Sequence, residues 1–264
     1  MKACWFDSFG AAHDVLQQGD WPTPEPGPGE VLVQLHATGV NPSDVKKRAG
    51  GFPDLLAAGP VIPHSDGAGV ITAVGEGVSP SRVDERVFVY QAQYGRQLGT
   101  AAETIALDST RAPVLPDAAS FEVGACIGIP IMTAHRCVFA DGPVAGQLIL
   151  VTGGAGRVGH YAIQWAHRAG ARVIATASSE EDATACREAG AEAVVNHREP
   201  GWGRAVLDKT GGQKIDRVID VEFGANLPAL LHCVRIGATI ATYSSTVVPE
   251  PALPFRTMMF MDLT

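Results

Sequence analysis

The pattern of apolar and polar positions divides the chain into two parts. Before about residue 117, short segments alternate apolar and polar residues, as in VLVQLHA at 31–37, which is the period of a half-buried strand. We expect further strands at 1–6, 67–74 and 86–90 and a short helix at 41–48. The segment WPTPEPGPGE at 21–30 cannot be helical because its prolines remove backbone donors. Short strands between such turns predict a compact β-barrel-like domain.

The second part alternates strands with helices. Residues 121–138 are apolar and rich in alanine, which predicts a helix that Pro130 breaks or kinks. Strands are then expected at 148–151, 172–176, 193–196, 216–221 and 238–243, and helices at 158–169, 180–189, 202–209 and 225–233. This alternation predicts an α/β domain with a doubly wound parallel sheet. We place the domains at 1–120 and 121–264.

Charge, cysteine content and hydropathy exclude several classes of function. The net charge is −8 and no run of lysine or arginine stands out, which argues against a nucleic-acid partner. The five cysteines are scattered and odd in number, which favours a reducing compartment such as the cytoplasm over a disulfide framework. We expect no signal peptide, because the N-terminus lacks a basic segment followed by an apolar run. We expect no membrane span, because no stretch approaches about 18 consecutive apolar residues.

A glycine triplet follows the first strand of the second part. Within LILVTGGAGRVG, residues Gly153, Gly156 and Gly159 lie between a predicted strand and a predicted helix. Such a turn lets the backbone approach a pyrophosphate, which the N-terminus of the helix attracts. The whole turn is expected to contact a nicotinamide dinucleotide through Gly153, Gly154, Ala155, Gly156, Arg157, Val158 and Gly159. The alternative is a strand–helix turn without a ligand.

The end of the second strand of this part indicates which dinucleotide binds. A carboxylate at that position usually holds the ribose 2′-hydroxyl of NAD, whereas this chain has Ala177 followed by Ser178 and Ser179. His197 and Arg198, after the third strand, are candidate partners for a phosphate. These residues predict NADPH, and the alternative for Arg198 is a solvated surface arginine.

Several segments together resemble one enzyme family. They are ATGVNPSDVKKRAG (37–50), IPHSDGAGVITAVGEGV (62–78), GACIGIPIMTAHRCVF (124–139), ILVTGGAGRVGHYAIQWAHRAGARVIAT (149–176) and EAGAEAVVNHRE (188–199). They are similar to the zinc-independent, zeta-crystallin-like quinone oxidoreductase branch of the medium-chain dehydrogenase/reductase superfamily. The resemblance implies a GroES-like β-barrel domain, a Rossmann domain and a homodimer. It also implies a last Rossmann strand and a segment that returns to the first domain, and residues 255–264 lie where that part would begin, so the sequence is interpreted as either incomplete or a truncated variant.

The resemblance also bears on metal binding. Zinc-dependent relatives carry a cysteine at the position of Asn41 and a histidine at the position of Ser65, and neither residue present here is a zinc ligand. No cysteine lies between Cys4 and Cys126 to form a structural zinc site. His64 beside Asp66 is interpreted as a pair that forms a turn. We therefore expect no metal.

The resemblance implies three catalytic candidates. Asn41 would hydrogen-bond the nicotinamide ribose or the substrate oxygen, and Thr133 would contact the nicotinamide–phosphate region; a local turn and a local helix bond are their structural alternatives. Lys46 replaces a tyrosine that can donate a proton in many relatives, and could do so itself or lie on a solvated helix face. Ser179 replaces a lysine that binds phosphate in some relatives.

The expected function is NADPH-dependent hydride transfer to quinones without a metal. Two alternatives stay open: a reductase of enones or enoyl thioesters, and a non-catalytic, crystallin-like protein that binds NADPH. Absence of a tyrosine at position 46 favours quinones over enones.

Overall fold

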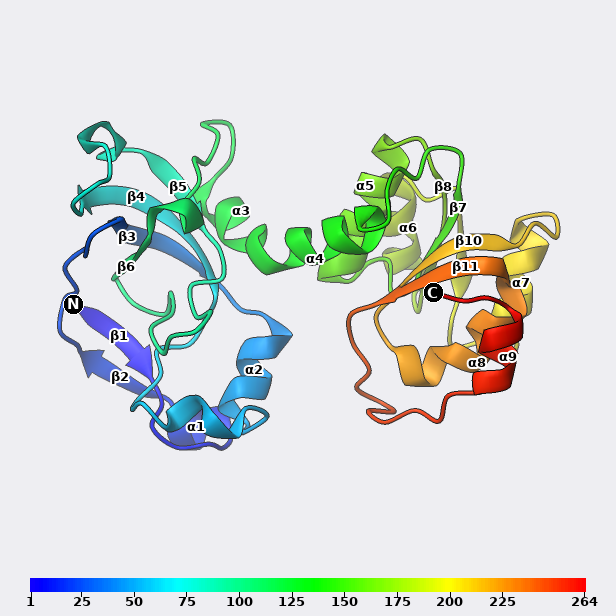
Figure 1. The fold of residues 1–264 in the computed structure, drawn as a ribbon, viewed down its shortest axis with the longest axis horizontal. Helices are drawn as coiled ribbons and strands as arrows, with labels where there is room; N and C mark the ends of the chain where they lie inside the picture. The colour runs from blue at the N-terminus through cyan, green and yellow to red at the C-terminus, as the bar shows by residue number, and fades with distance from the viewer. The chain divides into compact units, whose positions relative to one another are not determined.

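The computed structural model describes residues 1–264 and divides into two compact units, Met1–Pro130 and Ile131–Thr264 (Figure 1). We refer to them as unit 1 and unit 2. The helix that begins at Phe121, which the sequence placed in the second domain, belongs to unit 1. It packs on two central strands of that unit, which explains why the division lies beyond it.

Unit 1 is built on a four-stranded antiparallel sheet in the order β5-β4-β3-β6. The strands are β3 (Glu30–Gly39), β4 (Asp66–Val74), β5 (Arg86–Val89) and β6 (Thr104–Asp108), and a hairpin joins β1 (Lys2–Trp5) to β2 (Gln17–Asp20). Alternate residues such as Val31, Val33 and Ile71 are fully buried in one core, as the period of two predicts. The four predicted strands are confirmed, and β2 and β6 are additional.

Short helices lie between and after the strands of unit 1. They are α1 (Ala12–Val15), α2 (Pro42–Arg48), α3 (Phe121–Cys126) and the 3₁₀ turns Pro53–Leu56, Pro80–Arg82 and Ser109–Arg111. The predicted helix at 41–48 is confirmed as α2. The Asp44 carboxylate accepts the backbone N–H of Asn41 at 2.8 Å, and Pro42 occupies the first helical position. Both features are typical of a helix start.

The helix predicted across 121–138 consists of two helices. α3 ends at Cys126 and α4 runs over Gly128–Phe139, so the chain breaks at Ile127 and not at Pro130. The expected position of the break was therefore wrong. Pro130 lies in the first turn of α4, where a backbone N–H has no intrahelical acceptor and its loss costs little.

Unit 2 contains a five-stranded parallel sheet in the order β11-β10-β7-β8-β9. Its strands are β7 (Leu148–Val151), β8 (Arg172–Ala177), β9 (Ala193–Asn196), β10 (Ile215–Asp220) and β11 (Val234–Thr242). Every residue of β7 is buried, as expected for a central strand covered on both faces.

Helices cover the two faces of this sheet in pairs (Figure 1). One core contains residues of α5 (Arg157–Arg168) and α6 (Glu180–Glu188), and a second core contains residues of α7 (Trp202–Lys209) and α8 (Phe223–Cys233). The predicted doubly wound parallel sheet is confirmed. A last helix, α9 (Phe255–Phe260), leads into residues that hydrogen-bond β11 through Gly237 and Ile240.

No helix of the protein combines the length and the apolar character needed to cross a bilayer.

Candidate functional site

The turn between β7 and α5 is shaped by close approaches that only glycine allows. We call residues 153–159 the glycine turn. Gly153 has a φ of +60°, and a Cβ on Gly154 would lie 2.8 Å from the Cys186 Sγ and 2.9 Å from the Ala175 Cβ. A Cβ on Gly159 would overlap the carbonyl oxygen of Gly153. The glycines therefore hold the backbone of the turn tightly against β8 and the start of α5.

A buried polar pair anchors the start of the turn. Thr152 donates its hydroxyl to Asp220 Oδ1 at 2.8 Å and accepts the backbone N–H of Val221 at 3.0 Å. Asp220 also accepts from the Asn226 amide at 2.8 Å, and burial raises the pKa of its carboxyl. These bonds tie the carboxyl end of β7 to that of β10. The sequence offered no signal for this pair.

The N-terminus of α5 carries no side-chain cap. Gly156 is the N-cap residue, has extended backbone and supplies no side chain, whereas Ser120 caps α3 and Ser179 caps α6 through their hydroxyls. The first N–H groups of a helix lack intrahelical partners and carry a partial positive charge. Because no side chain caps them here, the glycine turn fits the pyrophosphate of a dinucleotide.

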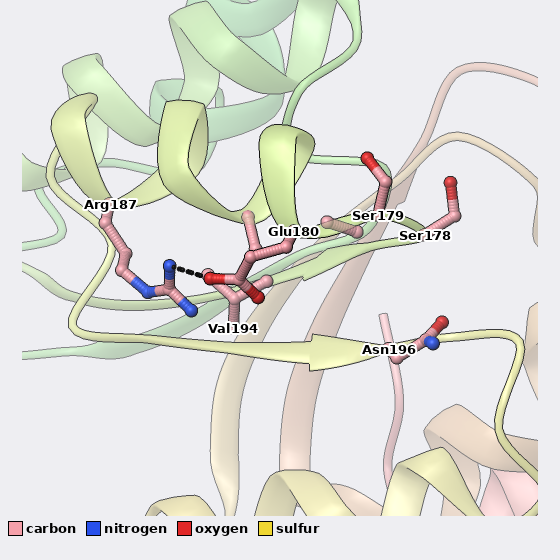
Figure 2. Close-up of a pocket in the computed structure, with 8 residues that line it drawn as sticks. Ser178, Ser179, Glu180, Arg187, Val194 and Asn196 are labelled. Atoms are coloured by element: carbon pink, nitrogen blue, oxygen red, sulfur yellow. Dashed lines mark hydrogen bonds and ion pairs between the residues drawn. The ribbon is translucent and has the colours of Figure 1, made fainter.

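A pocket of about 260 Å³ lies where β8 and β9 end against α6 (Figure 2). Ser178 and Ser179 line it at the end of β8, Val194 and Asn196 line it from β9, and Glu180 and Arg187 line it from α6. The Arg187 guanidinium contacts the Glu180 carboxylate at 2.7 Å. The serine hydroxyls are partly engaged, because Ser179 accepts the N–H of Asp182 at 3.1 Å and Ser178 donates to the Asp182 carboxylate at 3.4 Å.

The predicted phosphate partners after β9, His197 and Arg198, are placed differently from Ser178 and Ser179, which line the pocket. His197 donates its backbone N–H to the Ala177 carbonyl at 3.3 Å, its Nδ1 is buried without a partner, and burial lowers its pKa. The side chain of Arg198 is exposed, and neither residue lines the pocket. Arg187 does line it, and sequence reasoning missed this residue. Its spacing of seven from Glu180, which places both on one face of α6, was an available signal.

In unit 1, Asn41 is buried and hydrogen-bonded to a buried acid. Its Nδ2 donates to Asp66 Oδ2 at 2.7 Å, and the backbone N–H of Ile129 donates to the same oxygen at 2.9 Å. Asp66 is 1% exposed, and its other oxygen is buried without a partner. Burial raises the pKa of Asp66 to about 6, and the bond from Asn41 opposes this shift. The Asn41 amide is therefore fixed by Asp66.

Lys46 and Lys47 face different surroundings. Lys46 is exposed, whereas Lys47 is partly buried and donates to the Gln93 Oε1 at 3.1 Å and to the Ser65 Oγ at 3.4 Å. Burial lowers the pKa of Lys47, and the negative charges of Asp44 and Asp66 oppose this shift. We call Asn41, Asp44, Lys47, Ser65 and Asp66 the polar cluster. Asp44, Asp66 and Lys47 were not predicted to form it.

His64 adopts a left-handed backbone at the edge of the polar cluster. Its φ is +75°, and its Nδ1 lies 3.0 Å from the Thr38 hydroxyl, which in turn lies 2.7 Å from the Thr100 hydroxyl. Burial lowers the pKa of His64. The positive φ fits the turn that the sequence predicted for His64 and Asp66. No group of three or more His, Cys, Asp or Glu side chains is arranged to hold a metal ion.

Thr133 lies in α4, on the part of that helix that belongs to unit 2, and is partly buried.

Two family models match the chain. Residues 27–117 match the alcohol dehydrogenase GroES-like domain, and residues 158–264 match the zinc-binding dehydrogenase model. The first lies within unit 1 and the second within unit 2. The expected pairing of a GroES-like domain with a Rossmann-type domain is thereby confirmed.

Relatives in sequence and a solved structure agree with these matches. The chain is 34% identical to quinone oxidoreductase of Rattus norvegicus over 241 residues, which cover 91% of this chain and 72% of the relative. It is 31% identical to quinone oxidoreductase of Pseudomonas aeruginosa, covering 94% of this chain and 74% of the relative. A mycobacterial structure complexed with NADPH superposes with a TM-score of 0.86 at 31% identity, covering 100% of this chain and 81% of that one. With its two domains, its glycine turn and these similarities, the chain belongs to the quinone oxidoreductase branch of the medium-chain dehydrogenase/reductase superfamily.

Proposed function

We propose that this protein is an NADPH-dependent reductase that transfers hydride to quinones without a metal. The observation that carries the proposal is the uncapped N-terminus of α5 behind a turn whose glycines admit no side chain. Relatives of this chain are quinone oxidoreductases, and a structural neighbour holds NADPH. NADPH supplies the hydride when bound.

The residues of unit 2 would hold the cofactor by its phosphates. The glycine turn presents backbone N–H groups to the pyrophosphate, with Arg157 exposed at the first helical position. Ser178, Ser179, His197 and Arg198 are our candidates for the end of the cofactor that carries the 2′-phosphate. Ala177 ends β8 without a carboxylate that would repel a second phosphate.

Three side chains are proposed to act near the reacting atoms. Asn41 would hydrogen-bond the nicotinamide ribose or the acceptor oxygen; its amide is held by Asp66, which fixes the direction of its remaining groups. Thr133 would contact the nicotinamide–phosphate region. Lys46, whose ammonium is exposed, would donate a proton to the oxygen of the acceptor as hydride arrives.

Independence from metal is proposed from the chemistry of the side chains. A catalytic zinc site uses about three Cys, His or carboxylate ligands. The carboxylates in this part of unit 1, Asp44 and Asp66, both accept from Asn41, and Ser65 accepts from Lys47, so an amide and an ammonium group stand among them. A quinone accepts hydride readily once protonation is provided, and therefore does not require a Lewis acid.

We further propose a cytoplasmic homodimer without nucleic-acid or membrane partners. All five cysteines are free thiols, and the net charge of −8 disfavours polyanions. Exposed apolar side chains of the last hundred residues, among them Ile236, Phe255 and Phe260 at 70% exposure each, support burial against a second copy. Sedimentation velocity tests the dimer, and a monomer at micromolar concentration would contradict it.

The acceptor is tested by a panel of quinones, enones and an enoyl thioester with NADPH. We expect turnover with quinones and slower turnover or none with the other acceptors. Preference for an enone or thioester would favour reduction of activated C=C bonds. Binding of NADPH with no turnover on any acceptor would favour the non-catalytic alternative.

A further inference from the structure

The pocket beside α6 contains one cation among its lining residues. Arg187 is that cation, and its guanidinium reaches along α6 to contact the Glu180 carboxylate at 2.7 Å (Figure 2). Ser178, Ser179 and Asn196 also line this space of about 260 Å³, but their side-chain groups bond Asp182, Arg198 and Glu199. The Arg187 guanidinium is therefore the group of the cavity that an anion would meet, close to the end of β8.

The ion pair between Arg187 and Glu180 is weakly held. The side chain of Arg187 is 47% exposed and that of Glu180 is 81% exposed. An exposed pair of this kind contributes little to stability, because water screens the charges and the side chains lose freedom. Glu180 can therefore rotate into solvent at small cost, which leaves the guanidinium available to another anion.

A phosphate group is a better partner for Arg187 than the exposed carboxylate. It carries up to two negative charges and three acceptor oxygens, and a guanidinium can bind two of those oxygens at once. The first turn of α6 carries Glu180, Glu181 and Asp182, and these carboxylates oppose binding of an anion. A cation is needed to offset them if a phosphate is to enter, and Arg187 is the one that lines the pocket.

We propose that Arg187 selects the 2′-phosphate of NADPH and that Glu180, by pairing with Arg187, limits that selection. This inference rests on the proposed function, since it assumes that the adenosine end of the cofactor reaches the end of β8. It assigns discrimination between NADPH and NADH to a residue at the C-terminal end of α6, beyond the serines, His197 and Arg198. Arg187 would change partners, releasing the Glu180 carboxylate when the 2′-phosphate binds.

The test compares dissociation constants of NADPH and NADH for the wild type and for single variants. Arg187→Gln is expected to weaken NADPH about tenfold or more and to leave NADH within about twofold. Arg187→Lys keeps the positive charge but loses the planar guanidinium that can bind two oxygens at once. Its dissociation constant for NADPH is expected to lie between those of the wild type and Arg187→Gln. Glu180→Gln is expected to tighten NADPH severalfold. Arg204→Gln, an exposed arginine of α7, is the matched control and should change neither constant.

The outcomes separate this inference from the proposed function. Binding of neither cofactor by the wild type would overturn the proposed function. Binding of both, with a ratio that Arg187→Gln leaves unchanged, would overturn this inference alone. The same holds if Arg198→Gln, and not Arg187→Gln, removes the preference for NADPH. Thermal unfolding of each variant confirms that lost binding does not reflect lost folding.

Discussion

The glycine turn of unit 2 and the polar cluster of unit 1 differ in which atoms they present. In the glycine turn the backbone is the functional group: tightly packed glycines shape it, and no side chain caps the first N–H groups of α5. In the polar cluster the functional groups are side chains: Asn41, Asp66, Lys47 and Ser65 are bonded to residues distant in sequence, and Asp44 accepts the backbone N–H of Asn41.

This difference decides how each region responds to substitution. A backbone turn has no atom that a smaller side chain could remove, so it is damaged by added volume. A buried polar cluster is damaged by removing partners, because each orphaned group then keeps its desolvation cost.

The largest effect is expected for Gly159→Val in the glycine turn. The new side chain would overlap the Gly153 carbonyl oxygen and push the start of α5 away from β7. We expect NADPH binding to be lost and the free energy of unfolding to fall by about 1–3 kcal/mol or more. Calorimetric titration with NADPH and chemical unfolding measure the two effects. Gly27→Ala is the control, because its Cβ would meet only the flexible Glu30 carboxylate at 3.4 Å. Tight NADPH binding by Gly159→Val would contradict the role of the turn.

The next effect concerns the pH dependence of stability through Asp66. Burial raises the pKa of this carboxyl from 3.8 to about 6, so protonation favours the folded state. Its contribution is complete below the unfolded pKa and is lost as pH rises through about 6. Relative to Asp66→Asn, the wild type should lose at most about 3 kcal/mol between about pH 4 and pH 8.

Urea unfolding of both proteins across this pH range measures the difference. The amide oxygen of Asp66→Asn can still accept from Asn41 and Ile129, which makes it a conservative comparison. If both proteins show the same pH dependence, Asp66 does not titrate as its burial implies.

A smaller effect is expected for Lys46→Met. If Lys46 protonates the acceptor, kcat should fall by about ten- to a hundredfold, while NADPH binding and the melting temperature stay near the wild-type values. Steady-state kinetics with a quinone measures kcat directly. An unchanged kcat would assign Lys46 to a solvated helix face instead.

The smallest effect is expected for Lys47→Met at the neighbouring position, and it should be an effect on stability and not on kcat. This change removes the donor to Gln93 and Ser65, so stability should fall by about 1–2 kcal/mol. The two lysines are adjacent in sequence, and opposite phenotypes, catalytic for Lys46 and structural for Lys47, would sharpen the contrast. Equal losses of kcat in both variants would argue against it.

The contrast also explains how much the sequence could predict. The glycine turn, the parallel sheet and α2 follow from local spacing and period, and they were found with bounds close to those observed. The break of the helix at Ile127 was missed because Pro130 was interpreted as lying in the middle of one helix. It lies in the first turn of α4, where proline is tolerated.

The polar cluster could not be predicted in the same way. Lys47 and Gln93 are 46 positions apart, and Asp66 and Ile129 are 63 apart, so only the folded sheet of unit 1 brings them together. Nothing in the DVKKR segment indicates that Lys47 is partly buried and Lys46 exposed. Arg187 is intermediate, because its helical spacing from Glu180 was visible although its position beside the pocket was not.

The most direct measurement is NADPH oxidation by benzoquinone after the protein has been stripped with a chelator and its metal content determined. We expect turnover to survive at the untreated rate with far less than one zinc per chain, and to be absent in Gly159→Val. Loss of turnover on chelation, with recovery on addition of zinc, would contradict hydride transfer by a metal-free site.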